Sequence, residues 1–165
     1  MAPPAKPKPL ALDSNLPLDL AEDLDAAHTF REEFQRRGYV LLVPPTVVTE
    51  LTLKAESKGE KALLAMRALQ SLRDWGIQPF DLKSVGHGIT EAFARKLISR
   101  GLLPEDEFND GVIIAETALF EIPLLVTSDH HLLDIAPESL RLELEAFDLP
   151  SVAVAHPRLM LRALY

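Results

Sequence analysis

The sequence predicts an α/β domain with a mainly parallel sheet of about five strands. Short apolar runs bounded by turn residues alternate with longer segments whose apolar residues recur at helical spacing. The 165 residues suffice for one domain that buries its core without a disulfide or a structural metal. We therefore expect a single domain over residues 10–165.

The N-terminal elements follow in order. Residues 1–9 are rich in proline and lysine, a composition that favours an extended chain, so we expect a disordered arm. A short strand is predicted at Leu10–Asp13. Apolar spacing then predicts a helix over Ala21–Arg37, which Gly38 ends, and Tyr39–Val43 forms a second, buried strand.

A proline pair stops the second strand, and Thr46 is expected to cap the helix that follows. The next helix is predicted over Lys61–Trp75 and the third strand over Ile77–Leu82. The rest of the chain continues the alternation, with helices at Ile89–Arg100, Asn109–Phe120 and Pro137–Phe147, strands at Leu124–Thr127 and Val152–Val154, and a short helix from Pro157.

Composition excludes several classes of protein. The 17 basic and 25 acidic residues give a net charge of −8, which argues against coating nucleic acid by bulk charge. The chain has no cysteine, so thiolate nucleophiles, zinc ribbons and iron–sulfur sites are excluded. It also has neither an apolar run of the ~20 residues that span a bilayer nor a signal peptide. We expect a soluble, cytoplasmic protein without a membrane segment.

Acidic residues occupy the positions where a parallel sheet binds ligands, beyond the carboxyl ends of its strands. Asp13 closes the first predicted strand and Asp129 the fourth, while Asp110 begins the helix that leads into the fourth. Glu50 lies in the first turns of the helix after the second strand. Four converging carboxylates would repel one another unless a cation lay among them. Oxygen donors favour a hard cation, Mg²⁺ or Mn²⁺.

Each acid also has an ordinary structural explanation. Asp13 could cap a helix, Asp110 could complement a helix N-terminus, and Asp129 could be a turn residue. Glu50 could pair with Lys54 four residues later. Their joint order along the chain favours a shared site.

Short segments carrying these acids occur in the order and spacing of a PIN domain. The segments are LDSN at 12–15, PTVVTEL at 45–51, NDGVIIAETAL at 109–119, LLVTSD at 124–129 and the ending LPSVAVAHP at 149–157. The chain therefore resembles the PIN-domain family over nearly everything from Leu10 to Leu164. That family consists largely of metal-dependent ribonucleases and includes the VapC-type toxins of toxin–antitoxin pairs.

The resemblance implies a fold, a site and partners. The fold would be a doubly wound three-layer domain with helices on both faces of the sheet. The acidic quartet would be Asp13, Glu50, Asp110 and Asp129, which hold Mg²⁺ or Mn²⁺, with Asn15 and Thr127 as the neighbours that orient it. The implied activity is hydrolysis of single-stranded or structured RNA. An antitoxin partner and a homodimer are common in the family.

Other residues near the quartet have two possible roles each, one in the site and one in the local structure. Glu107 is an optional fifth ligand, or simply an acid near a helix N-terminus. His130 and His131 follow the fourth strand, where a solvated turn competes with a ligand role. Glu116 lies well around the helix from Asp110 and is not expected to contact the metal.

A basic track could hold RNA beside the metal. If the helix after the proline pair continues far enough, Lys54, Lys58 and Lys61 fall close to one stripe with Glu50. An ordinary solvated face is the alternative, and Gly59 could break the helix.

Two other functions compete with a nuclease. A PIN-like module could bind RNA or assemble without cutting, although the complete quartet speaks against it. A receiver domain or an aspartate-nucleophile phosphatase would also use an Asp after the first strand. The phosphatase would need a second Asp where Asn15 stands, and the receiver would need paired acids before Asp13.

Overall fold

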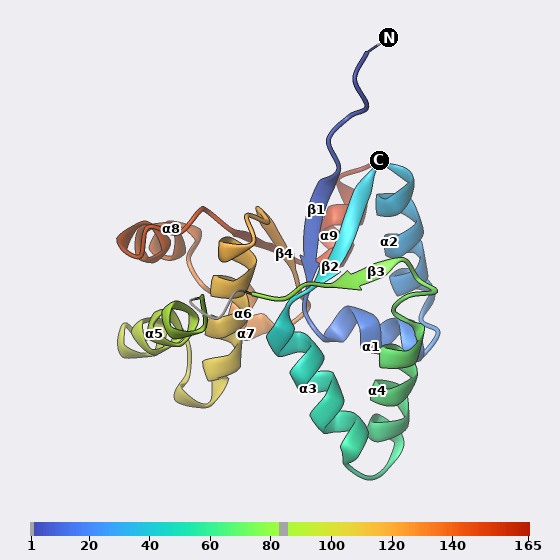
Figure 1. The fold of residues 1–165 in the computed structure, drawn as a ribbon, viewed down its shortest axis with the longest axis horizontal. Coiled ribbons are helices and arrows are strands. Elements are labelled where there is room, and N and C mark those ends of the chain that lie inside the picture. Colours follow the sequence, from blue (N-terminus) through green and yellow to red (C-terminus); the bar gives the residue numbers. More distant parts are fainter. Residues whose placement is uncertain (1, 83–85) are drawn as a thin grey trace.

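The fold centres on one five-stranded parallel sheet in a computed structural model that describes residues 2–82 and 86–165 (Figure 1). The strand order is β3-β2-β1-β4-β5, and every neighbouring pair is parallel. The strands are β1 (Lys8–Leu12), β2 (Tyr39–Val43), β3 (Ile77–Pro79), β4 (Leu124–Val126) and β5 (Ala153–Ala155). The predicted α/β class with a parallel sheet is confirmed.

Helices lie on both sides of this sheet, with α2 and α9 on one side and α5, α6 and α8 on the other (Figure 1). The α-helices are α1 (Asn15–Ala21), α2 (Asp25–Arg36), α3 (Pro45–Glu56), α4 (Glu60–Ser71), α5 (Gly86–Ser99), α6 (Phe108–Leu119), α7 (His130–Leu133), α8 (Pro137–Ala146) and α9 (Pro157–Arg162). A 3-10 turn, η1 (Glu105–Glu107), precedes α6. No helix among the described residues is long and apolar enough to cross a membrane.

The core runs through the middle strands and α6. The last three residues of β1 and of β2 are buried, as expected for central parallel strands covered on both faces. In α6, every residue from Asp110 to Ala118 is buried. Because α6 has no solvated face, its polar residues Asp110, Glu116 and Thr117 must find partners inside the protein.

β1 begins two residues earlier than predicted, so the end of the predicted arm belongs to the sheet. Lys8 pairs with Tyr39 and Pro9 with Val40, and the Lys8 ammonium lies 5.2 Å from the centre of the Tyr39 ring. Residues 2–7 are exposed and have no regular secondary structure. Met1 of the predicted arm lies outside the described residues.

The predicted helix over Ala21–Arg37 is wrong in its first part. The chain forms α1 immediately after β1, turns at Asp23, whose φ is 60°, and begins α2 only at Asp25. The left-handed backbone at Asp23 ends any continuous helix. The short helix α1 follows β1 almost directly and runs across the end of the sheet before the chain enters α2 (Figure 1).

A glycine lets α6 approach α5 closely, and this contact can be tested. A Cβ at Gly111 would lie 2.8 Å from both Cα and Cβ of Ala94. We expect Gly111→Ala to force the helices apart and to lower the free energy of unfolding by about 1–3 kcal/mol. Gly88→Ala, in α5, is the control, because its Cβ would meet nothing within 4 Å. Thermal unfolding that left both variants as stable as the wild type would contradict the close packing.

Candidate metal centre

The acidic residues meet where the strand order reverses. β1 lies between β2 and β4, and the chain winds one way from β1 to β3 and the other way through β4 and β5. In such sheets the crevice at this switch point, beyond the carboxyl ends of the strands, is the place where ligands bind. Asp13 directly follows β1, and Asp129 lies three residues beyond the end of β4.

Three carboxylates converge at this point. Oxygen atoms of Asp13, Asp110 and Asp129 all lie within 4.8 Å of one another. Asp13 and Asp110 are buried, while Asp129 is partly exposed. Glu50 is not a member of this closest group, although the charge of Asp13 raises its pKa, so it lies at the flank of the cluster. The structure thus brings together three of the four acids that the sequence singles out, with the fourth beside them.

Hydrogen bonds hold Asp13 in a fixed orientation. The Thr127 hydroxyl donates to Asp13 Oδ2 over 2.7 Å, and the backbone N–H of Ser14 donates to Oδ1 over 2.7 Å. The Thr127 Oγ1 in turn accepts the backbone N–H of Asp129 over 3.0 Å. One threonine therefore ties the carboxylate after β1 to the loop after β4.

Asn15 ties the same two loops together from the other side. Its Oδ1 accepts the backbone N–H of Ser128 over 3.1 Å. Asn15 is the first residue of α1, so this bond also sets where that helix begins relative to β4. The two polar neighbours of the quartet thus fix the relative position of Asp13 and Asp129.

Burial and mutual repulsion favour protonated carboxyls in the absence of a cation. The pKa of Asp110 is raised to about 9, first by burial and then by the charges of Asp13, Asp129 and Glu107. The pKa of Glu50 is raised to about 7 by burial and by Asp13, against the lowering effect of Lys54. Burial also raises the pKa of Asp13, although Thr127 and Ser14 oppose it.

The donor set fits a hard divalent cation. Asp110 Oδ2 is buried and has no hydrogen-bond partner among the described residues. Leaving a buried carboxylate oxygen without a partner is costly, and a cation among the three carboxylates would supply that partner. Carboxylate oxygens are the ligands that Mg²⁺ and Mn²⁺ prefer.

The remaining acid and the two histidines form a rim beside the cluster. Glu107 Oε1 lies 3.6 Å from His131 Nε2, and its charge acts on Asp110. Asp129 Oδ1 accepts the backbone N–H of His131 over 2.9 Å, so the predicted turn is in fact the capped start of α7. Ligand atoms of Asp129, His130 and His131 also lie within 4.8 Å of one another.

The predicted lysine stripe is not continuous. α3 carries Lys54 but ends at Glu56, and Gly59, with a φ of 99°, starts the turn into α4. Lys58 therefore lies between the helices and Lys61 lies on α4. Only Lys54 acts on the cluster, because its charge lowers the pKa of Asp13 and of Glu50.

Thr46 does not cap α3 as the sequence predicts, because Pro44 is the cap residue and Pro45 the first helical residue. Instead, the N–H and hydroxyl of Thr46 donate to the two carboxylate oxygens of Glu116 over 3.1 and 3.0 Å. Glu116 is buried on α6, so it joins the helix of Glu50 to the helix of Asp110. The sequence signal of this role is an acid that follows five apolar or small residues inside a helix.

Comparison with known proteins supports the fold. No family model and no curated protein matches the chain. The solved structure of VapBC2 from Rickettsia felis bound to a DNA fragment from its promoter contains a chain with 14% sequence identity and a TM-score of 0.63. The match covers 90% of this chain and 98% of that chain.

A chain of FitAcB from Neisseria gonorrhoeae matches with 20% identity and a TM-score of 0.54, covering 90% of this chain and 97% of that one. Identities this low establish a shared fold and leave activity open. The protein is therefore an α/β domain with the PIN-like fold, as the sequence motifs predict.

The repulsion within the cluster predicts how stability varies with pH. A carboxyl whose pKa is raised by folding stabilises the protein at low pH and loses that contribution as pH rises towards its folded-state value. With chelator present, we expect wild-type stability to fall between about pH 5 and pH 9, the range below the Asp110 pKa. Asp110→Asn should flatten this fall and raise the melting temperature at pH 9 by a few degrees, about 1 kcal/mol or more.

Asp74→Asn is the matched control, because Asp74 is exposed in the turn before β3, at the opposite edge of the sheet. Its melting curve should follow the wild type at every pH. An Asp110→Asn variant that is no more stable than the wild type at pH 9 would contradict the repulsion.

Proposed function

We propose that this protein is a cytoplasmic, metal-dependent endoribonuclease that uses Mg²⁺ or Mn²⁺, and that it is the toxin of a toxin–antitoxin pair. The observation that carries the proposal is the cluster of Asp13, Asp110 and Asp129 at the switch point of the sheet, within 4.8 Å of one another. A buried oxygen of Asp110 without a partner adds to it.

In this proposal Asp13, Asp110 and Asp129 hold the metal directly, and Glu50 and Glu107 stand beside it. When bound by these carboxylates, the ion would supply an activated water and positive charge next to the phosphodiester. Thr127 and Ser14 keep Asp13 oriented, so the carboxylate does not rearrange when the charge of the substrate arrives. Among the residues that the structure describes, Lys54 is a cation whose charge acts on Asp13 and Glu50, and it is suited to contact the phosphate that enters.

The biological role rests on the resemblance of the motifs to VapC-type toxins and on the fold shared with a chain of a VapBC complex. An antitoxin and a second copy of the chain are the partners proposed on this basis. A small gene directly upstream that encodes a partner copurifying with this chain would support the pair.

A PIN-like module that binds RNA or assembles without cutting it is the second candidate. Such a module needs the fold but has no use for three converging carboxylates, whose repulsion destabilises the metal-free protein. The cluster therefore favours the nuclease.

The cleavage prediction is tested on single-stranded and hairpin RNAs labelled at one end. We expect cleavage with Mg²⁺ or Mn²⁺, none with chelator, and a loss of about 10²-fold or more in Asp13→Asn and in Asp110→Asn, since each removes a charge that stabilises the reacting centre. Asp74→Asn should cut like the wild type. If cleavage persists with chelator, or if both variants still cleave RNA, the reaction does not depend on the proposed metal centre.

A separate prediction concerns Lys54. Charge reversal, Lys54→Glu, should raise KM for RNA and reduce the salt dependence of binding by about one phosphate contact, because the side chain lies beside the cluster. Lys58→Glu and Lys61→Glu should have smaller effects, since α3 ends before both. Arg73→Glu is the matched control, because it lies in the turn before β3 at the opposite edge. If all four charge reversals changed KM equally, Lys54 would contribute only through the net charge of the protein and would not contact the RNA beside the cluster.

A further inference from the structure

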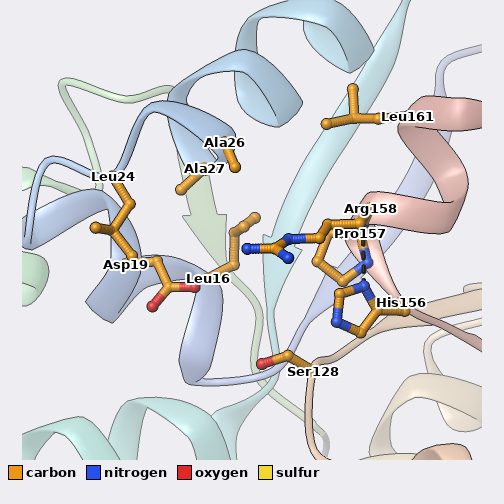
Figure 2. Close-up of a pocket in the computed structure, with 10 residues that line it drawn as sticks. All are labelled: Leu16, Asp19, Leu24, Ala26, Ala27, Ser128, His156, Pro157, Arg158 and Leu161. Carbon is orange, nitrogen blue, oxygen red and sulfur yellow. Dashed lines mark hydrogen bonds between the residues drawn. The ribbon is translucent and has the colours of Figure 1, made fainter.

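A cavity of about 140 Å³ lies between α1, α2, the loop after β4 and the start of α9, and one of the residues that line it, Ser128, precedes Asp129 in the sequence (Figure 2). Its walls are mostly apolar, from Leu16, Leu24, Ala27 and Leu161. An apolar cavity of about 150 Å³ admits benzene, so this one has room for one six-membered ring, such as the pyrimidine ring of a base. Four polar residues also line it: Asp19, Ser128, His156 and Arg158.

The two charged residues in the cavity have no partners of their own. Within residues 2–82 and 86–165, no hydrogen bond or ion pair involves the side chain of Asp19 or of Arg158. Arg158 extends from α9 toward α1, which carries Asp19 (Figure 2). Their charges act on each other, because Arg158 lowers the pKa of Asp19 against the larger effect of burial. The cavity thus presents a guanidinium donor and a carboxylate acceptor that are both available to a ligand.

His156 supplies a ring of fixed orientation at the same cavity. Its Nδ1 accepts the backbone N–H of Arg158 over 3.1 Å, so the neutral ring carries its hydrogen on Nε2. Aromatic and histidine rings are the surfaces on which proteins stack unpaired RNA bases. The ring, the guanidinium and the carboxylate together form the elements of a nucleobase site.

This cavity is continuous in sequence with the metal centre. Ser128 lines the cavity and stands between Thr127, which holds Asp13, and Asp129. Leu16 lines it too and follows Asn15, which accepts the N–H of Ser128. A ligand in the cavity and a phosphate at the carboxylates would therefore contact residues of the same two loops, after β1 and after β4.

We propose that this cavity binds a guanine base of the RNA, next to the phosphate that the metal centre cleaves; the cleavage part rests on the proposed function. The N1–H and N2–H₂ groups of guanine donate to the two oxygens of Asp19, and its O6 and N7 accept from Arg158. Guanine alone offers two adjacent donors on this edge, whereas adenine and cytosine offer one amino group and uracil one imino group. The cavity therefore selects guanine over the other three bases.

The binding test uses nucleoside monophosphates with chelator present, so that it needs neither metal nor catalysis. Isothermal titration should give GMP an affinity at least roughly fivefold higher than AMP, CMP or UMP, the gain expected from one bidentate contact. Asp19→Asn and Arg158→Gln should each remove most of this preference. Arg162→Gln, one turn further along α9 and outside the cavity, should keep it.

Several outcomes would overturn the proposal. They are equal binding of the four nucleotides, no binding of any of them, or a preference that survives both Asp19→Asn and Arg158→Gln. A cavity that takes a peptide side chain of a partner protein instead would give the second outcome, and the partner would then protect Arg158 in hydrogen-exchange or crosslinking experiments. The melting temperature of each variant shows that the fold is intact.

Cleavage assays separate this proposal from the proposed function. RNAs with a single guanosine at successive positions should be cut at a fixed offset from it, and Asp19→Asn should lose the offset. If the protein binds GMP but cleaves no RNA, the guanine-site proposal is supported and the proposed nuclease activity is contradicted. If it cleaves RNA without a preference for guanosine, the nuclease activity is supported and the guanine-site proposal is contradicted.

Discussion

Asp13, Asp110 and Asp129 meet beyond the carboxyl ends of β1 and β4. The surrounding structure must hold these three carboxylates together against their mutual repulsion. Burial makes the repulsion stronger, and it raises the pKa of Asp110 to about 9. The hydrogen bonds that Thr127 and Ser14 donate to Asp13 keep that carboxylate in place and oppose its protonation. A fold that holds such a group together without a cation gives up stability there, as functional sites commonly do.

The helices supply the rigidity that this arrangement requires. α6 is buried almost throughout and approaches α5 closely at Gly111, so Asp110 is carried by an element that cannot shift easily. From the same helix, Glu116 accepts two hydrogen bonds from Thr46 and fixes the start of α3. Since α3 carries Glu50 and Lys54, one buried glutamate outside the cluster determines where the fourth acid and the nearest cation lie. The site is thus fixed by core packing as much as by its own hydrogen bonds.

The sequence predicts the sheet and the acids at its edge because both follow from local patterns. Apolar runs determine the strands, and Asp13 follows its run directly while Asp129 comes three residues after the other, so parallel pairing brings them to one edge. The errors arise where tertiary contacts prevail over local signals. Thr46 is a good capping residue, yet a glutamate seventy residues away takes its hydrogen bonds. The break at Asp23 depends on left-handed backbone at a non-glycine residue, which a helical pattern does not reveal, whereas the break before Lys61 has a visible signal in Gly59.

The net charge of −8 bears on how this protein could hold RNA at all. Bulk attraction to phosphates is weak for such a chain, so the charge of Lys54 beside the carboxylates has little general support. A neutral base is not repelled by the acidic surface, and an apolar cavity with one donor and one acceptor can bind it by stacking and hydrogen bonding. Binding energy gained from a base positions the phosphate without added positive charge, which would otherwise compete for the metal ligands. The proposed nuclease, being acidic, is therefore expected to recognise bases locally, and the proposed guanine site lined by Asp19 and Arg158 would meet that requirement.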